Sequence, residues 1–492
     1  MEESRDLIVL IFVGLYMALC IAIGLWAIRK TKSSSDFFMA GRHLGVMLTA
    51  FAVFSSTLSG FGFVGGPGLV YKMGMSSIWM VVCSAMGYVL SFTLLSKKIR
   101  LIGELRNCIS LPDVVMARYR SDSVRIWTSI AILLGVMGYL AVQILAMAHV
   151  LKDIFASSGF GLGLEMCVFI SCAVLVFYTV TGGIVASVYT DLVQGGVMIV
   201  AALLIFFTVM TTYDGGFTEM NRIIMADDPE AIGPWGTLGM VGCLSWFFVF
   251  GLGGCGQPHI ITKIMMNKKV SDGKRILPLT AVSYVAAALL WIGIGLVMRA
   301  LVVSGAHPPL DSPDAAAPQF LQHYAHPILA GVVFAGLLAA IMSTADGFLN
   351  IGTAAVVHDI PKAIRGHALK NEMFWARVTT VLIAVVAAVF ALYTGDLVAI
   401  LGAFGWGTFA AAIVPVVALG LNWKRATPLA ANVAIISSLA INFGAKIFSI
   451  QLPFNFNIGA LSLAVSLTLF IGISLFSDPP EIDSDVEAIM DM

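Results

Sequence analysis

One acidic residue stands in apolar sequence near the start of a long hydrophobic run. It is Asp191, within the segment Thr190-Asp191-Leu192-Val193-Gln194. An ionised carboxylate inside a membrane span is costly unless it is paired or coordinates an ion, so it marks a candidate functional residue. The alternative is a structural Asp at a helix N-terminus, stabilised by the helix dipole and facing water. Position alone leaves both interpretations open.

A second polar group could bind a cation. Ser343 and Thr344 are adjacent hydroxyls in an apolar run, and Asp346 lies three residues after Ser343, hence on nearly the same helix face. Hard cations take oxygen ligands. Further oxygens could come from main-chain carbonyls of an unwound stretch, such as those of Ser55 and Leu58. Hydroxyls in helices more often bond the carbonyl one turn back, but the added carboxylate favours a sodium site.

Several other residues could contact a solute. Gln143 lies in an apolar run, where its amide could bond a solute or, more commonly, a neighbouring helix. A lone His such as His259 near a membrane end is more often structural. Aromatic residues usually face lipid or core, but beside broken helices they could form the walls of a cavity. The candidates for such walls are Phe61, Trp246, Phe250 and Trp406.

The elements that position these residues are membrane-spanning helices. Of the 492 residues, 59% are hydrophobic and 11% are charged, whereas soluble domains carry roughly 25% charged residues. Apolar runs of about 20 residues recur, and backbone groups in lipid must bond within their own segment, which favours helices. We predict thirteen spans, at about 7–28, 46–71, 76–96, 126–151, 161–181, 186–211, 238–262, 277–303, 326–350, 374–394, 396–420, 427–447 and 455–476.

Two of these spans are interrupted by glycine and proline. The second contains Ser59-Gly60-Phe61-Gly62 and then Gly65-Gly66-Pro67-Gly68, and the seventh contains Gly251 to Pro258 with four glycines. Glycine and proline weaken helices, and freed backbone groups are tolerated in a membrane only inside protein or at a cavity. Glycines that merely allow close helix packing are the alternative. Two breaks five spans apart favour inverted repeats with a binding site near the midplane.

The basic loops predict how the chain is oriented. With the N-terminus outside, most of the 28 Lys and Arg fall in cytoplasmic loops, as the positive-inside rule requires. We therefore expect a multi-pass protein of a bacterial inner membrane with a cytoplasmic C-terminus and an acidic, disordered tail. The expected organisation is a first span and loop (1–45), a first repeat (46–211), an extracellular loop (212–237), a second repeat (238–420), two further spans (421–477) and the tail (478–492).

Other classes of protein find little support in the sequence. Net charge is zero, so nucleic acid is not an expected partner, and the seven Cys show no disulfide or zinc spacing. There is no Gly-x-Ser-x-Gly, P-loop, Cys-x-x-Cys or His-Glu-x-x-His motif. We expect a carrier and not an enzyme, with no cofactor other than a coupling ion. The expected partners are a small solute, sodium and lipid, with no obligate protein partner.

The chain resembles the sodium:solute symporters, closest to their bacterial sodium/proline and sodium/pantothenate branch. The resemblance runs from about residue 7 to 476. The motifs that carry it are Asp36 to Arg42, Leu111-Pro112-Asp113, Thr181-Gly182-Gly183 with Thr190 to Gln194, Gly256-Gln257-Pro258-His259, and Ala339 to Thr344. It implies an all-α leucine-transporter-type fold, a five-plus-five inverted repeat with flanking helices.

The resemblance also implies a sodium site between the second and ninth spans. Its matching positions are the carbonyls of Ser55, Leu58 and Ala340 and the hydroxyls of Ser343 and Thr344. Asp191 matches a carboxylate that serves a second sodium in some members. In those members the carboxylate works with hydroxyls one turn beyond the Ser-Thr pair, and at these positions this chain has Asp346 and Gly347. Asp346 could therefore strengthen a second cation site or could bind a proton instead. The candidate solute contacts are Thr57, Ser59, Phe61, Gln143, Phe250, Gly254, Gln257 and Trp406.

The solute is the point at which the resemblance and this sequence differ. The proline branch has an Asp where this chain has Thr57, and a Trp and a Tyr where it has Phe250 and Gly254. We expect a small organic acid, such as pantothenate or another monocarboxylate, or an amino acid, although the spans offer no Lys or Arg to pair an anion. The alternatives are a proton-coupled carrier using Asp191 or Asp346 and a transporter-like sensor. The absence of a repeated pore-loop or charged-ring pattern argues against a channel.

Overall fold

The computed structural model describes residues 2–29, 33–42, 44–157, 159, 161–213, 215–394 and 398–492. Within these ranges the protein is all-helical, and the extended structure is limited to one backbone bridge between Leu44 and Asn267. Thirteen helical segments of the described chain are long and apolar enough to cross a membrane. The predicted number of spans and the all-α membrane class are therefore confirmed.

The membrane-spanning elements follow the predicted ranges closely. They are α1 (Glu2–Ile28), α3 (Val46–Gly60) with η2 (Phe61–Gly65) and α4 (Gly66–Met73), α5 (Ser76–Leu94), α8 (Asp122–Ser157), α9 (Leu164–Thr212), α12 (Gly239–Trp246) with η4 (Phe247–Gly251), η5 (Leu252–Gly256) and α13 (Pro258–Met265), α14 (Gly273–Val303), α16 (Pro327–Ala354) with η8 (Ala355–Asp359) and α17 (Ile360–Arg365), α18 (Glu372–Thr394), α19 (Val398–Ile413) with η9 (Val414–Leu419), α20 (Pro428–Ile447) and α21 (Ile458–Phe476). Shorter connecting helices are α2 (Ser34–Met39), α6 (Ser96–Leu105), α7 (Leu111–Tyr119), α10 (Gly216–Asp227), α11 (Pro229–Ile232) and α15 (Ala316–His323).

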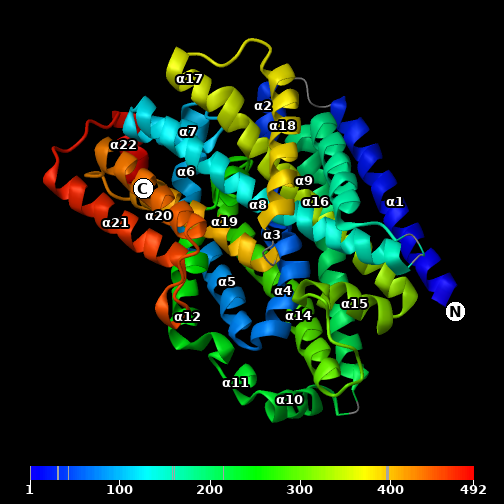
Figure 1. The fold of residues 1–492 in the computed structure, drawn as a ribbon. Helices are drawn as coiled ribbons and strands as arrows, with labels where there is room; N and C mark the ends of the chain where they lie inside the picture. The colour runs from blue at the N-terminus through cyan, green and yellow to red at the C-terminus, as the bar shows by residue number, and fades with distance from the viewer. Residues whose placement is uncertain are drawn as a thin grey trace.

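The spans form an inner and an outer layer. In the spans of α3–α4, α8, α16–α17 and α19, 78% or 83% of the most apolar window is buried inside the protein, against 22% for α1. Figure 1 shows α1 at one edge of the bundle and α20 and α21 at the opposite edge. Outer helices expose large apolar side chains, including Leu15, Phe207 and Leu382, as a lipid-facing surface requires. The predicted sodium ligands on α3 and α16 therefore belong to the inner layer.

A single glycine divides α9 into two spans. Gly183 has φ 56° and ψ −160°, and the Phe37 ring lies 2.8 Å from the place where a Cβ would stand. The left-handed φ and the close ring together require glycine here. The two resulting spans, Leu164–Thr181 and Gly183–Thr212, match those expected from the sequence.

Both predicted helix breaks are present. In α3 the break falls at Ser59, whose φ of 48° and ψ of −173° lie outside the helical region; a non-glycine residue in this conformation is strained. Its hydroxyl oxygen accepts the Phe61 N–H at 3.1 Å. The seventh span is interrupted through η4 and η5, and Gln257 is extended before Pro258 opens α13.

The two breaks are held together by inner helices. Helix α19 packs against η2 of the first broken span and η5 of the second, while α16 packs against α3, α8 and α9. Residues from helices far apart in sequence therefore meet at one level in the bundle.

The acidic tail is ordered, so the predicted disorder is wrong. Helix α22 (Ser484–Met490) packs against α6, with Val486 fully buried. Arg106 lies 2.8 Å from Asp483 and 2.6 Å from Asp485, and Lys424 lies 3.0 Å from Glu487. Composition counted the negative charge of the tail but not the basic side chains of Arg106 and Lys424, with which it pairs.

Reversing the basic partners is expected to release this tail. Each exposed ion pair contributes only about 0.2–1 kcal/mol and is screened by salt. Arg106→Glu with Lys424→Glu should increase amide hydrogen exchange over residues 484–490 several-fold, and 0.5 M salt should do so in the unmodified protein. Lys370→Glu, outside this contact, is the control. Unchanged exchange in the double variant would mean that apolar burial alone holds α22.

Candidate functional site

The predicted sodium ligands lie on α3 and α16, which pack against each other. Ser55, Leu58, Ala340, Ser343 and Thr344 are all buried. The Thr344 hydroxyl lies 3.1 Å from the carbonyl oxygens of both Ser56 and Ala340, and the Ser343 hydroxyl lies 3.3 Å from that of Ala340. The Thr344 hydroxyl therefore bonds across the two helices to Ser56, while the Ser343 hydroxyl bonds within α16. This set of neutral oxygens fits a small hard cation.

Asp191 lies beside this region and is paired with a lysine. Its carboxylate is fully buried, accepts from Lys263 Nζ at 2.8 Å, and also interacts with the hydroxyls of Ser55 and Ser343. The expectation that no Lys or Arg lies within the spans is therefore wrong. It failed because the seventh span was predicted to end at residue 262, one residue before Lys263, whereas the apolar segment runs to Met265.

Asp346 is a second buried carboxylate, on α16. It is fully buried and accepts from the Ser187 hydroxyl at 2.7 Å. Ser187 is one turn before Asp191 on α9, so both carboxylates face the α9–α16 contact. Their predicted role in a second cation or coupling site stays a prediction.

An aromatic cluster lies between the two helix breaks. Phe61 stacks with Phe250 at a centroid distance of 6.1 Å, and Phe250 contacts Trp406 at 5.6 Å and Trp246 at 6.2 Å. These four side chains, each predicted to line a cavity, come from η2, η4, α19 and α12 and are buried. The sequence-predicted walls are therefore brought together.

Unpaired polar atoms surround this cluster. The buried side-chain atoms that have no hydrogen-bond partner among the described residues include five on residues around the cluster: Gln143 Nε2, Gln257 Oε1, His259 Nδ1, Trp291 Nε1 and Trp406 Nε1. Three of them are donors, one is an acceptor and the imidazole nitrogen can be either. Buried polar atoms are nearly always paired, so a group of orphans beside an apolar wall indicates a ligand site. The excess of donors suits a carboxylate.

Two members of this group were not among the predicted contacts. The His259 ring lies 4.9 Å from that of Phe348 and 5.8 Å from that of Trp406, and its Nε2 is 3.5 Å from the Thr57 hydroxyl. Its position directly after the Gln257-Pro258 break was the available signal. Trp291 contacts Phe61 edge-on at 6.0 Å, and nothing in its own segment marked it.

The remaining candidates have mainly structural partners. The Gln143 Oε1 accepts the Gly60 N–H at 3.0 Å, which stabilises the first break, and the Ser59 hydroxyl lies 3.4 Å from the Tyr139 hydroxyl. A Cβ at Gly254 would stand 2.7 Å from Gly87 Cα, so this position allows close packing with α5 and offers a solute only its main chain. The Gln257 amide nitrogen donates to the Trp406 carbonyl at 3.2 Å.

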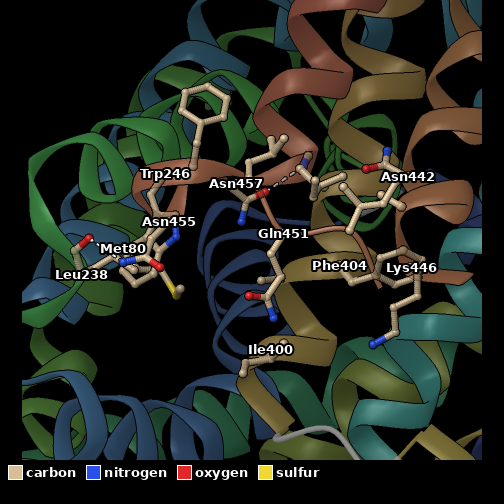
Figure 2. A pocket seen from close by; sticks show the side chains of 18 of the residues that line it. Met80, Leu238, Trp246, Ile400, Phe404, Asn442, Lys446, Gln451, Asn455 and Asn457 are labelled. Atoms are coloured by element: carbon tan, nitrogen blue, oxygen red, sulfur yellow. Dashed lines mark hydrogen bonds between the residues drawn. The ribbon is translucent and has the colours of Figure 1, made fainter. Parts of the chain in front are cut away.

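A cavity of about 480 Å³ leads toward the aromatic cluster. It lies between α12, α19 and the ends of α20 and α21, and Trp246, Phe404, Asn442, Gln451 and Asn457 are among its lining residues (Figure 2). Trp246 forms part of its wall and also packs against Phe250. Of the four aromatic side chains of the cluster, Trp246 is the one that lines this cavity.

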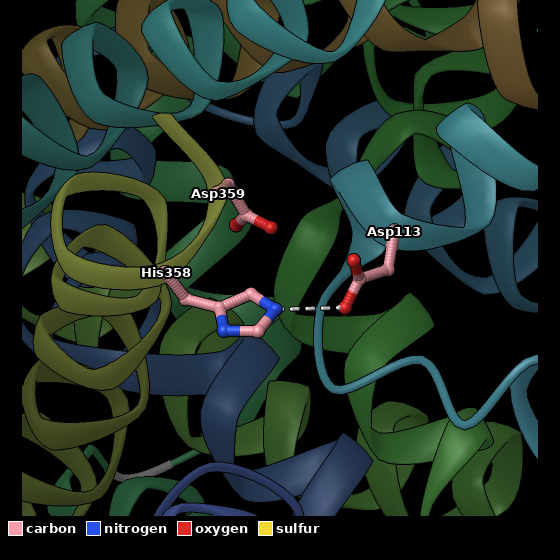
Figure 3. Close-up of side chains that lie close together, drawn as sticks. All are labelled: Asp113, His358 and Asp359. Atoms are coloured by element: carbon pink, nitrogen blue, oxygen red, sulfur yellow. Dashed lines mark hydrogen bonds and ion pairs between the residues drawn. The ribbon is translucent and has the colours of Figure 1, made fainter. Parts of the chain in front are cut away.

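A cluster of charged groups closes the opposite end of the inner helices. Asp113, His358 and Asp359 place ligand-type atoms within 4.8 Å of one another (Figure 3). However, Arg125 is bonded to Asp113 and lies 3.5 Å from Asp359, and Lys362 Nζ lies 3.2 Å from Asp113. These cations already neutralise the carboxylates and would repel a metal ion. The cluster is an ion-pair network that ties α7, α8 and η8 together.

Removing one charge from this network is expected to destabilise the protein. Burial alone would raise the pKa of Asp113, but His358, Arg125 and Lys362 hold that pKa well below its ordinary range, so its stabilising charge is present above about pH 4 and is lost only in stronger acid. Asp113→Asn should cost about 1–3 kcal/mol and lower the melting temperature. Glu104→Gln, which alters the exposed partner of Arg100, is the control; equal melting temperatures for the two variants would contradict the assignment.

Two broken helices that meet beside a hydroxyl-bearing inner helix, in a bundle of thirteen spans, define a secondary carrier of the leucine-transporter type. The model of the sodium:solute symporter family matches residues 37–438, and the chain belongs to that family. It is thus a multi-pass membrane protein of a family that couples transport to sodium.

Curated relatives agree with this assignment, and two solved structures share the fold. The chain is 28% identical to the osmoregulated proline transporter of Bacillus subtilis, over 88% of this chain and 87% of the relative. It is 30% identical to the sodium/proline symporter of Escherichia coli, over 83% and 81%. The fold is shared with a substrate-bound, outward-open sodium-coupled sialic acid symporter (TM-score 0.77, 18% identity, 97% and 99% covered) and with the nucleobase-cation symporter Mhp1 (0.56, 13%, 94% and 99%).

Proposed function

We propose that the protein imports a small carboxylate-bearing solute of the amino-acid type together with sodium, with proline as the first candidate. The observation that carries the solute class is the set of orphaned donors beside the aromatic cluster. A carboxylate would accept from the donors, and an apolar ring would pack against Phe61, Phe250 and Trp406. The curated relatives reported above are proline transporters, which moves the expectation away from pantothenate.

Sodium would bind at the crossing of α3 and α16, where Ser55, Leu58, Ala340, Ser343 and Thr344 provide the oxygens. A cation there would pull the strained segment around Ser59 against α16 and so fix the wall that carries Phe61. Sodium would raise the affinity for solute, and by reciprocity solute would raise the affinity for sodium.

The transport step would be a rocking motion of the two repeats about this site. The cavity bounded by Trp246 would be the outer approach, and the ion-pair network of Asp113 would close the inner side. This direction follows the proposed topology, with the N-terminus outside and the basic loops in the cytoplasm. Each sodium that moves inward across 100 mV releases roughly 2.3 kcal/mol to drive the solute.

A labelled-solute panel in proteoliposomes tests the solute. Proline, pantothenate, lactate, a sugar and sialic acid would each be offered with an inward sodium gradient. Uptake of proline, competed by other small amino acids but not by pantothenate, is expected. Uptake of pantothenate alone would return the assignment to an organic acid, and uptake driven by a pH gradient without sodium would identify a proton-coupled carrier.

A further inference from the structure

A buried lysine reaches the cation-binding region from the second broken span. Lys263 of α13 has only 2% of its side chain exposed, and its Nζ donates to Asp191 Oδ2 at 2.8 Å and to the Ala52 carbonyl at 2.7 Å. Asp191 has no exposed side-chain surface. Two opposite charges inside a membrane protein are tolerated because each compensates the other.

The ion pair adjoins the proposed sodium site directly. The Asp191 carboxylate interacts with the hydroxyls of Ser55 and Ser343, both members of that site. Ala52, which accepts from Lys263, lies one turn before Ser56, whose carbonyl contacts Thr344. The ammonium and a bound sodium would therefore draw on neighbouring oxygens of the same two helices, α3 and α16, with α9 supplying the carboxylate.

The oxygens around the ammonium are those that a second cation would use. They include a carboxylate and a main-chain carbonyl, with two hydroxyls beside the carboxylate. Asp191 Oδ1 has no hydrogen-bond partner within the described ranges, so this oxygen would be an acceptor for a second cation if Lys263 were removed. With Lys263 in place the pair is already neutral, and a second sodium would add an uncompensated charge to the membrane interior.

We infer that Lys263 is a tethered cation that fills the second cation position at Asp191, so that the carrier moves one sodium per solute. This inference rests on the proposed function. Asp191 then acts as a positioning residue that anchors α13 of the second broken span to α3 and α9. The charge carried inward in each cycle with a zwitterionic solute is the charge of one sodium ion.

Counting sodium ions bound to the purified full-length carrier tests this inference without relying on transport. Equilibrium binding of ²²Na⁺ should give about one ion per unmodified protein and about two for Lys263→Met, in which Asp191 is left to a second ion. Asp191→Asn with Lys263→Met removes both charges and should return the count to about one. Lys263→Arg, which keeps the cation, should also bind one, and Lys269→Met on the exposed neighbouring loop is the matched control.

Transport stoichiometry provides the second readout. The reversal potential of solute flux in proteoliposomes should correspond to one charge per solute in the unmodified protein and two in Lys263→Met. Asp191→Asn alone leaves an unpaired ammonium beside the sodium site and should raise the sodium concentration for half-maximal binding at least tenfold.

Two outcomes would overturn the inference. One is a count of two sodium ions in the unmodified protein, and this measurement needs no variant to fold. The other is a count of one in folded Lys263→Met, judged by size-exclusion chromatography. Absence of sodium-driven uptake of every solute would instead refute the proposed function and would leave the binding count to decide the role of Lys263.

Discussion

Thr344→Ala is expected to raise the sodium concentration needed for half-maximal uptake by about 10- to 100-fold. The Thr344 hydroxyl lies 3.1 Å from a carbonyl oxygen on α3 and 3.1 Å from one on its own helix, α16, so it links the two helices at the crossing. Losing a hydrogen-bonding or coordinating group to a charged partner costs about 1.5–3 kcal/mol, which corresponds to this range.

The matched control for this variant lies on the same helix. Thr353 is fully buried on α16, and its hydroxyl lies 3.0 Å from that of Thr380, away from α3. Thr353→Ala should leave the half-maximal sodium concentration within about twofold, a difference of less than 0.5 kcal/mol. If both variants shift equally, or if neither shifts, Thr344 does not hold the coupling ion.

Trp406→Phe is expected to raise the KM for solute by about 10-fold or more. The substitution keeps an aromatic ring against Phe250 but removes the indole N–H, which has no partner in the described part of the chain. A hydrogen bond from this donor to a carboxylate would contribute about 1.5–3 kcal/mol. Initial rates of sodium-driven uptake at saturating sodium give the KM directly.

A tryptophan outside the cluster separates this effect from general destabilisation. The Trp423 ring packs against that of Phe470, a residue of α21, at a centroid distance of 6.4 Å. Trp423→Phe should leave the KM unchanged. A Trp406→Phe variant with normal KM would show that this donor does not contact the solute, and the orphaned polar atoms would then need water as their partner.

The architecture could be predicted because it depends on composition and on individual glycines. Lipid selects long apolar helices, so hydropathy located all thirteen spans. The breaks at Ser59 and between Gly251 and Gln257 were visible because glycine and proline weaken a helix locally, whatever surrounds it.

The parts that failed depend on what lies across the fold. From the sequence, Lys263 was predicted to be the first residue of a basic loop. Its burial depends on its contacts with Ala52 of α3 and Asp191 of α9, which the sequence does not reveal. Trp291 could not be predicted as a site residue from its own segment, because only its contact with Phe61 places its unpaired indole N–H at the cluster. The tail is acidic by composition, but its order depends on contacts with distant basic residues. Arg106 is 377 residues before its partner Asp483, and Lys424 is 63 residues before its partner Glu487.

Concentrative uptake under a sodium gradient tests the central claim most directly. Proteoliposomes would be loaded with potassium buffer and diluted into sodium buffer with labelled proline. Accumulation above the external concentration, abolished by a sodium ionophore and absent in potassium buffer, is the predicted result. Accumulation to the same level in potassium as in sodium would contradict sodium-coupled symport.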